Sequence, residues 1–442
     1  MQKTIWLIVV TFIAGVVSLH LSLIDILLSV FSLPLLYFIF QKFSLRKHLA
    51  KYIMLFVVYA SVLFIPGFHL SYNQITTEQY SLAFSFGTKL FLVTSISWIV
   101  VGFFRRKRNK DIIYSHRRIS NSTVYGFLFF SIILSLYSLS IGLGRMGGQA
   151  VKLPFHLGGV IMVVRLFLIP YAFMLIYENF ILTKRKFDTL FFVLFLIWCM
   201  IEVFARLSKG ALVISLLPVT IIHWLYFRPT IKKMLPYLLP VLFLFFFLYP
   251  IVQNMRYVDS KSSFIESFFE AENESKTPNE KGNVFITALN RTFMTTNQYI
   301  NDYYVYSDKE LFNFSQAPAI IAIGGTGRYQ TVVIDGYDES AIHSSGTTGI
   351  MDPLLFGGYG FCYVMMFLLM WMASAIDNNY YKKMHSVYVI LLLLFLTFIR
   401  DRNISYPFAE NGLPYLLAYV VAIYIAIRYN FRSKHISIGP KK

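Results

Sequence analysis

Long apolar runs recur along this sequence and restrict its fold more than any other feature. A helix of about 20 apolar residues crosses the roughly 30 Å hydrocarbon core of a bilayer. Because that core offers no water to the peptide groups, such runs cross it as helices. Twelve apolar segments can be recognised, with approximate bounds 4–19, 21–40, 52–68, 84–104, 122–143, 158–182, 188–206, 210–227, 234–253, 350–376, 386–400 and 413–429. The sequence therefore predicts an all-α integral membrane protein with about 12 transmembrane helices.

Composition agrees with a membrane location. Of the 442 residues, 57% are hydrophobic and 14% are charged, whereas soluble domains contain about 25% charged residues. Cys199 and Cys362 both lie inside apolar segments, so we expect inert thiols and neither a disulfide framework nor a metal site. The first apolar run follows Lys3 and has no small-residue cleavage site after it. We therefore expect a retained helix and not a signal peptide.

The basic residues indicate how the helices are oriented. Taken in order along the predicted helices, 25 of the 40 Lys and Arg residues fall on one side of the membrane. Apart from Lys3, they lie in six segments, at residues 42–51, 105–118, 184–186, 228–233, 382–383 and 428–442. Positive residues concentrate in cytoplasmic loops, so this side is predicted to be the cytoplasm, with both termini there. The net charge of +18 then reflects membrane topology, and we expect no nucleic-acid partner.

One long connection, residues 254–349, falls on the opposite side. It contains seven Lys or Arg and twelve Asp or Glu residues, the reverse of the cytoplasmic bias. It divides the chain into helices one to nine (1–253), a large periplasmic loop (254–349), and helices ten to twelve with a basic tail (350–442). Within the loop, Phe285, Leu289 and Phe293 recur every four residues, which predicts an amphipathic helix at about 283–306. Loops of this length are usually functional.

Several charged residues lie where a membrane makes them costly. Arg165 and Lys89 fall about two turns inside the predicted outer ends of their helices, and Arg206 and Arg400 lie at such ends, with Glu202 as an acidic counterpart. Charges in apolar segments usually mark function, although Lys89 and Arg165 could also extend to the interface and remain hydrated. Guanidinium groups bind phosphate oxygens in pairs. The pattern favours a diphosphate site without a metal ion, because no metal-ligand spacing accompanies it.

Four short segments resemble the Wzy-type polysaccharide polymerases, the family of O-antigen and enterobacterial common antigen polymerases. They are Ala205–Leu212 (ARLSKGAL), Leu289–Thr292 (LNRT), His343–Gly346 (HSSG) with Pro353 and Gly357–Gly360 after it, and Phe398–Asp401 (FIRD). Their order is most similar to that of the common antigen polymerases. Together they cover roughly residues 200–415, and the first 200 residues resemble the family only in hydropathy.

The resemblance implies a GT-C-like architecture, related to that of O-antigen ligase, and a glycosyltransferase activity. The enzyme would transfer a growing glycan from undecaprenyl diphosphate to an incoming lipid-linked repeat unit. This reaction takes place on the periplasmic face of the bacterial inner membrane and uses no cofactor. The implied partners are the lipid-linked oligosaccharide, membrane lipids and a co-polymerase that regulates chain length.

Roles can be assigned to particular residues. His343 is the expected general base, because the pKa of an unperturbed histidine is near 6.5; Glu202, Asp302 and Asp352 are the alternatives. The expected diphosphate-binding cations are Arg206, Lys209, Arg291 and Arg400, followed by Arg256 and Arg328, with either Arg206 or Lys209 matching the basic residue of the first motif. Tyr299, Tyr303 and Asp302 are weaker candidates for sugar binding. The loop helix and residues 324–328 are expected to form a lid over the site.

Two other functions are compatible with these features. An O-antigen ligase uses the same donor but transfers the glycan to lipid A–core. A transporter of lipid-linked oligosaccharides could also have twelve helices with both termini inside. The sequence disfavours a transporter because its halves show no internal repeat and because the outer loop is long. It also contains no phosphate-binding loop of an ATP-driven pump.

Overall fold

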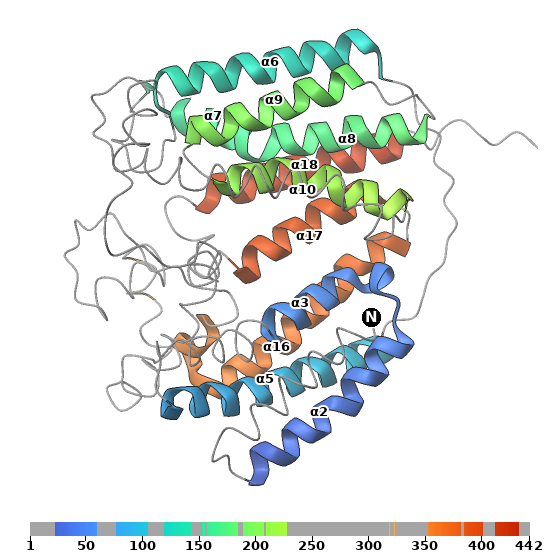
Figure 1. Cartoon of the computed structure of the whole chain (residues 1–442), viewed down its shortest axis with the longest axis vertical. Coiled ribbons are helices and arrows are strands. Elements are labelled where there is room, and N and C mark those ends of the chain that lie inside the picture. The colour runs from blue at the N-terminus through green and yellow to red at the C-terminus, as the bar shows by residue number, and fades with distance from the viewer. Residues whose placement is uncertain are drawn as a thin grey trace, which may run out of the picture. The chain divides into compact units, whose positions relative to one another are not determined.

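The computed structural model describes residues 23–59, 77–104, 119–143, 153–154, 157–183, 189–206, 209–227, 318, 322, 352–381, 384–400 and 412–432. Every regular element of these residues is a helix (Figure 1), which confirms the all-α class. The elements are α2 (Leu23–Lys42), η1 (Leu45–His48), α3 (Leu49–Tyr59), α5 (Thr77–Phe104), α6 (Asn121–Ser140), α7 (Leu157–Val163), η4 (Val164–Leu168), α8 (Ile169–Leu182), α9 (Thr189–Arg206), α10 (Lys209–Phe227), α16 (Asp352–Tyr381), α17 (His385–Arg400) and α18 (Gly412–Arg432).

Five helical segments of the described residues are long and apolar enough to cross a membrane. They are Phe84–Gly102, Asn121–Ser140, Leu157–Leu182, Thr189–Arg206 and Gly360–Tyr380. Shorter apolar helices occupy Leu49–Tyr59, Ile214–Phe227, His385–Leu396 and Leu417–Arg428. Ten of the twelve predicted spans coincide at least in part with the observed helices. The spans at 4–19 and 234–253, and the loop helix at 283–306, lie outside the described residues.

The chain forms two compact units, each assembled from separate parts of the sequence. The first unit contains α2, η1, α3, α5 and α16, together with the second part of α17, from Leu391. The second unit contains α6, α7, η4, α8, α9 and α10, the first part of α17, and α18 from Pro414.

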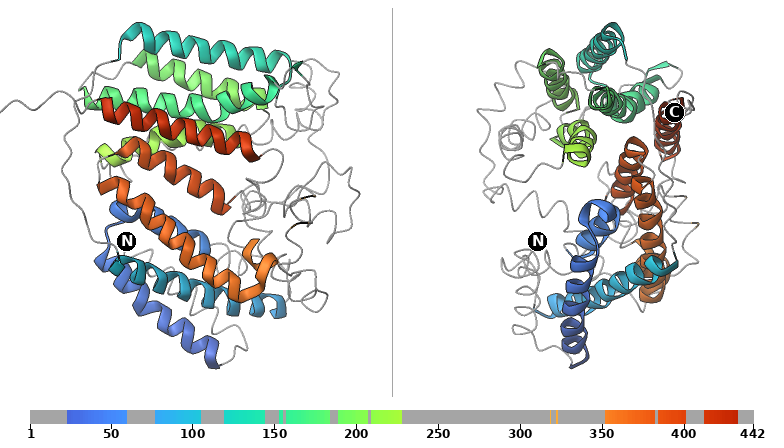
Figure 2. Two further views of the ribbon diagram at one scale, coloured as in Figure 1. Left: turned by 180° about the vertical axis from the view of Figure 1, so that it is seen from behind. Right: turned by 90° about the vertical axis from the view of Figure 1, so that its right-hand side faces the viewer.

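The first unit is organised around the packing of α16 against α5 and α3 (Figure 2). α16 continues beyond the apolar segment predicted to end at residue 376. Within this extension Asp377 is buried, and its Oδ1 accepts the backbone N–H of Ala50 at 3.0 Å. This bond satisfies one of the donors that the start of α3 leaves without a partner in its own helix.

A buried cation accompanies the aromatic core of the first unit. Trp98 of α5 packs against Tyr52 and Phe43, with ring centroids 4.6 and 5.5 Å apart. Lys51 Nζ lies 5.4 Å from the Trp98 ring centroid, a distance at which a cation is attracted by the ring face. Lys51 belongs to the basic segment 42–51 that is predicted on the cytoplasmic side, and its side chain is buried in the unit. The aromatic rings offset part of the cost of that burial.

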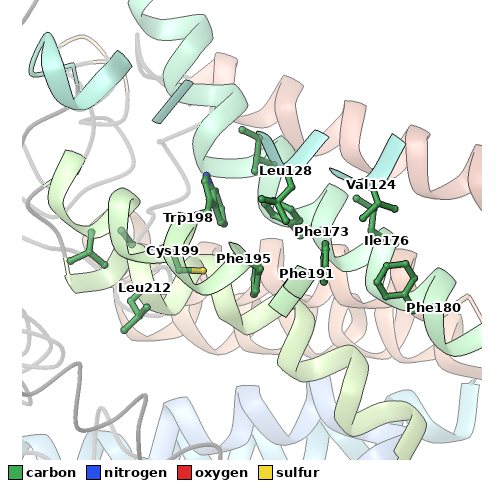
Figure 3. Close-up of a cluster of buried hydrophobic side chains, with 13 residues drawn as sticks. Val124, Leu128, Phe173, Ile176, Phe180, Phe191, Phe195, Trp198, Cys199 and Leu212 are labelled. Carbon is green, nitrogen blue, oxygen red and sulfur yellow. The ribbon is translucent and has the colours of Figure 1, made fainter. Parts of the chain in front are cut away.

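The second unit has an aromatic core between α6, α8 and α9 (Figure 3). Phe173 of α8 lies at its centre, with its ring centroid 4.9 Å from those of both Phe195 and Trp198 and 5.3 Å from that of Phe127. Cys199 belongs to the same core, and Cys199 and Cys362 are both buried free thiols, as predicted. Close packing of this kind holds the ends of α6 and α9 side by side, where the polar cluster described next is located.

Candidate functional site

The end of α6 is shaped by Gly142. This glycine has φ +68°, a left-handed conformation that other L-residues adopt only with strain. The N–H of Gly142 donates to the Leu139 carbonyl at 3.2 Å, and the N–H of Leu143 donates to the Ser138 carbonyl at 2.9 Å. These two bonds form a Schellman motif, which closes the helix. The turn leaves the Leu143 carbonyl beside the polar cluster.

A π-helical turn positions Arg165. The segment η4 interrupts the helix between α7 and α8, and the backbone N–H of Ile169 donates to the Val164 carbonyl five residues earlier. Pro170 follows immediately, and because proline has no N–H it cannot continue the ordinary hydrogen-bond ladder. Such π turns re-aim side chains and occur often at functional sites. Here the turn carries Arg165, which is buried.

α9 contributes three side chains on one face. Trp198, Glu202 and Arg206 follow one another at intervals of four residues, so they are stacked along the helix. Arg206 is the last residue of the helix. The three side chains therefore run from the aromatic core to the end of α9.

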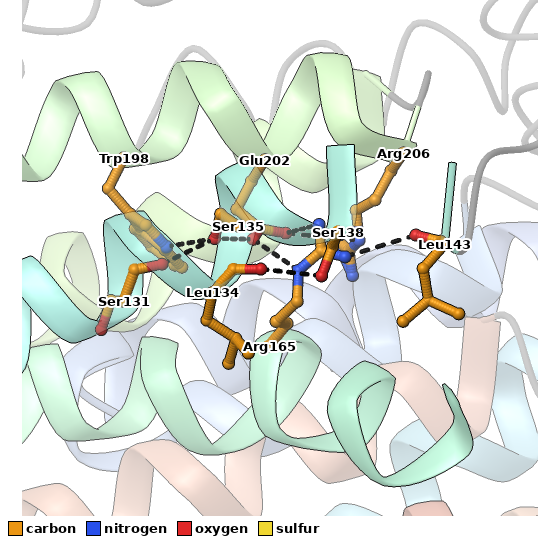
Figure 4. A network of polar contacts seen from close by, with 9 residues as sticks. All are labelled: Ser131, Leu134, Ser135, Ser138, Leu143, Arg165, Trp198, Glu202 and Arg206. Atoms are coloured by element: carbon orange, nitrogen blue, oxygen red, sulfur yellow. Dashed lines mark hydrogen bonds and ion pairs between the residues drawn. The ribbon is translucent and has the colours of Figure 1, made fainter. Parts of the chain in front are cut away.

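Glu202 is the centre of the cluster (Figure 4). Arg165 donates Nε–H to Glu202 Oε1 at 2.9 Å and Nη2–H to Oε2 at 3.1 Å. Arg165 Nη1 also donates to the Leu143 carbonyl at 3.3 Å. Arg206 Nε lies 3.7 Å from Glu202 Oε2. A single carboxylate is thus shared by two guanidinium groups, one held by a paired contact and the other by a looser one.

Two neighbouring side chains orient the carboxylate. The Ser135 hydroxyl donates to Glu202 Oε1, and Trp198 Nε1–H donates to the Ser135 oxygen at 3.0 Å. Ser135 is in addition within hydrogen-bond distance of the Ser131 carbonyl, at 2.9 Å. The indole N–H of Trp198 occupies one lone pair of the Ser135 oxygen. The hydroxyl hydrogen of Ser135 therefore points away from the indole, toward an oxygen acceptor. The chain from Trp198 to Ser135 to Glu202 connects the aromatic core to the ion pairs.

The cluster is deeply buried, and its charged side chains all come from η4 and α9 among the described residues. The relative exposures of Arg165, Glu202 and Arg206 are 1%, 1% and 5%. Among the described residues the cluster contains two guanidinium groups and one carboxylate. Buried charges are expensive unless they are paired, and in apolar helices they usually mark function. The buried arginines at the end of α9 therefore mark this cluster as the candidate site.

The structure describes only part of the predicted site. Arg206 belongs to the cluster, together with Arg165, which is buried and ion-paired and does not extend to an interface. Lys209 and Arg400 are the first residue of α10 and the last residue of α17, and only their backbones are described. The remaining predicted residues lie outside the described residues: Arg256, Arg291, Tyr299, Asp302, Tyr303, Arg328 and His343.

Other predicted charges have separate roles. Lys89 belongs to the first unit, where its Nζ donates to Ser85 Oγ at 3.0 Å. Both oxygens of Glu202, one of the alternative general bases, accept hydrogen bonds from Arg165. Within the described ranges, no group of three His, Cys, Asp or Glu side chains could hold a metal ion.

Two features of the cluster were not predicted from the sequence: the Ser135–Trp198 hydrogen bond and the π turn. The four-residue spacing of Trp198, Glu202 and Arg206 was a visible signal for the shared face of α9. Pro170 was a signal for an irregular helix near Arg165. No local signal in the sequence identifies Ser135, because α6 contains several serines with the same apolar surroundings.

A second buried polar group lies between the other ends of α8 and α10. Glu178 is buried, and its Oε1 accepts the hydroxyl proton of Tyr226 at 2.9 Å. One turn of α10 earlier, His223 Nδ1 lies 2.6 Å from the Tyr177 hydroxyl oxygen. These contacts join α8 to α10.

Comparison with known proteins found no relative of this chain. No protein-family model matches the sequence, and no match was found among curated proteins or among solved structures.

Proposed function

We propose that this chain is a membrane glycosyltransferase that polymerises undecaprenyl-diphosphate-linked oligosaccharide repeat units. It would act on the periplasmic face of the bacterial inner membrane and pass the growing glycan to the incoming repeat unit. The observation that carries the proposal is the buried cluster in which Arg165 and Arg206 share the single carboxylate of Glu202. The four motifs that resemble the Wzy-type polymerases support it.

The proposal includes a topology of twelve helices with both termini in the cytoplasm and a GT-C-like architecture. In that topology α6 and α9 run outward and α7–α8 returns. The shared end of these helices then lies near the periplasmic surface of the membrane. This is the depth at which the diphosphate of a lipid carrier is found, so the arginines would meet an anionic ligand there.

The chemistry of the transfer explains why fixed cations are needed. When the acceptor hydroxyl attacks the anomeric carbon, the glycosidic bond to the diphosphate breaks and negative charge develops on the leaving group. Preorganised cations in a site of low dielectric stabilise such charge more strongly than water does. Arg206 is proposed as one of these cations, with Lys209, Arg291, Arg400, Arg256 and Arg328 as further candidates. His343 is proposed to accept the proton of the hydroxyl.

A sugar-ladder assay in a polymerase-null strain tests the proposal. Complementation with the wild type should restore a ladder of glycan lengths. Arg206→Ala should reduce polymerisation by about 10²–10³-fold, and His343→Ala should abolish it. Arg428→Ala is the matched control, because Arg428 is exposed and its guanidinium lies over the ring of Tyr424. A wild type that produces no ladder, or an Arg206→Ala variant with full activity, would contradict the proposal.

The same strain distinguishes polymerase from ligase and transporter. Loss of a polymerase leaves single repeat units attached to lipid A–core, whereas loss of a ligase leaves the core without any repeat unit. Loss of a transporter leaves the repeat units on the cytoplasmic face. In vitro, the purified protein should lengthen lipid-linked repeat units without added nucleotide or divalent metal.

A further inference from the structure

The connection between α2 and α3 exposes basic and aromatic side chains on one face. From this arrangement we infer that the α2–η1–α3 hairpin is a binding surface for anionic phospholipid headgroups, with Lys42 and Lys47 as the residues that contact the phosphates. The inference goes beyond the proposed transferase activity and does not depend on it. It requires only that the hairpin lies at a membrane surface, as the apolar segments on either side of it predict.

The hairpin is held together on its inner face. The Tyr52 hydroxyl of α3 donates to the carbonyl of Phe43, the residue after the end of α2, at 2.7 Å. The Phe43 ring packs edge-on against His48 and also contacts Trp98, with centroid distances of 5.2 and 5.5 Å. Because these contacts fix the turn, the residues on its opposite face are presented in one defined arrangement.

The last turns of α2 expose aromatic rings beside a cation. Tyr37 and Phe38 are 56% and 41% exposed, whereas Leu36 and Ile39 are buried. Lys42 is exposed, and its Nζ lies 4.9 Å from the centroid of the Phe38 ring. Tyrosine rings concentrate at the headgroup level of a bilayer, and lysines near helix ends extend their ammonium groups to the same level. The outer face of α2 therefore has the composition of a membrane interface.

The turn itself continues this face. In η1, Leu45 is 45% exposed and Lys47 is also exposed. An exposed leucine beside a lysine suits a bilayer surface, where the leucine can enter the boundary between headgroups and acyl chains. The lysine can then extend toward the phosphate groups.

The charge of the hairpin favours an anionic lipid. Residues 26–77 contain four Lys or Arg residues, at positions 42, 46, 47 and 51, and no acidic residue. Lys51 is buried against aromatic rings, so Lys42 and Lys47 are the exposed cations whose side chains the structure describes. Among the described residues, neither of these two lysines forms an ion pair with a carboxylate. Both ammonium groups can therefore pair with phosphate oxygens of lipids, and an anionic headgroup complements their charge.

Fluorescence quenching of the full-length protein in nanodiscs tests the inference. Ser44→Cys carries the fluorophore, because Ser44 is exposed and its side chain makes no capping hydrogen bond. Cys199 and Cys362 are buried, so the label is confined to position 44. The nanodiscs contain equal amounts of phosphatidylglycerol and phosphatidylcholine, with brominated acyl chains on one lipid or on the other. The two quenching curves give the local ratio of the lipids, which should favour phosphatidylglycerol by about 5-fold or more at low salt and should fall as salt rises.

The decisive variant is Lys42→Gln/Lys47→Gln in the labelled protein. Both side chains are exposed, so the melting temperature should stay close to that of the parent protein, while the lipid ratio at the label should approach equality. Lys42→Arg/Lys47→Arg keeps both charges and should keep the preference. Arg428→Gln is the matched control, because it removes an exposed cation from α18, in the second unit, and it should leave the ratio at the label unchanged.

Equal quenching by the two brominated lipids in the parent protein would overturn the inference, and it is the result expected if this surface bound an acidic protein instead. A preference that persists in the double glutamine variant would overturn it as well, because other cations would then attract the lipid. The sugar-ladder assay is independent of this measurement. A protein that forms no ladder but retains the lipid preference at position 44 would refute the proposed function and support the lipid-binding surface.

Discussion

Glu202 is the residue on which the stability of the buried cluster depends. Its carboxylate accepts hydrogen bonds from Arg165 and Ser135 and lies beside Arg206. Glu202→Ala would leave the Arg165 guanidinium buried without its counter-ion. We expect a loss of about 3–5 kcal/mol in the free energy of unfolding, the range seen when one partner of a buried pair is removed. Thermal unfolding of the purified protein, monitored by size-exclusion chromatography, measures the effect.

The control for that prediction is the double apolar variant of Arg165 and Glu202, which removes both charges together. It should unfold much closer to the wild-type temperature than Glu202→Ala does. Equal destabilisation of the single and double variants would mean that packing, and not the unpaired charge, determines the cost.

A substitution of Trp198 tests its hydrogen bond to Ser135. Trp198→Phe keeps an aromatic ring beside Phe173 and Phe195 but removes the N–H that donates to Ser135. The lost hydrogen bond should lower the free energy of unfolding by about 1 kcal/mol. Trp371→Phe is the matched control, because Trp371 is 53% exposed, and it should have almost no effect. An equal effect of the two substitutions would contradict the role given to Ser135.

At the scale of the element, the turn that ends α6 decides where the Leu143 carbonyl lies. Gly142 has φ +68°, and a Cβ added there would meet nothing within 4 Å. The cost of Gly142→Ala is therefore backbone strain alone, about 1–2 kcal/mol. Gly126→Ala, in the same helix with equally open space, should be stabilising by about 0.5–1 kcal/mol. Thermal unfolding of both variants checks this contrast, and an equal shift for the two would argue against the left-handed conformation.

At the scale of the whole molecule, the orientation of the helices can be measured by labelling. Ser115→Cys lies in the predicted cytoplasmic segment 105–118, and Ser275→Cys lies in the predicted periplasmic loop. A membrane-impermeant maleimide should label Ser275→Cys in intact spheroplasts and Ser115→Cys only after permeabilisation. Cys199 and Cys362 are buried, so the unmodified protein should stay unlabelled and serves as the blank. The reverse pattern would invert the topology and with it the proposed periplasmic site.

Hydropathy and segment length predicted a helical protein, and ten of the predicted apolar segments coincide at least in part with helices, because both properties depend only on neighbouring residues. It also singled out Arg165, Glu202 and Arg206 as costly charges in apolar segments. That these three residues form one cluster, joined to Ser135 and Trp198, becomes visible in the folded structure. Arg165 and Glu202 are 37 residues apart on different helices. Arg165 lies in the π turn before Pro170, and the Schellman turn at Gly142 and helix α6 add the Leu143 carbonyl and Ser135 to the cluster. Which helix faces meet is set by the packing of the whole unit, and local sequence patterns do not encode it.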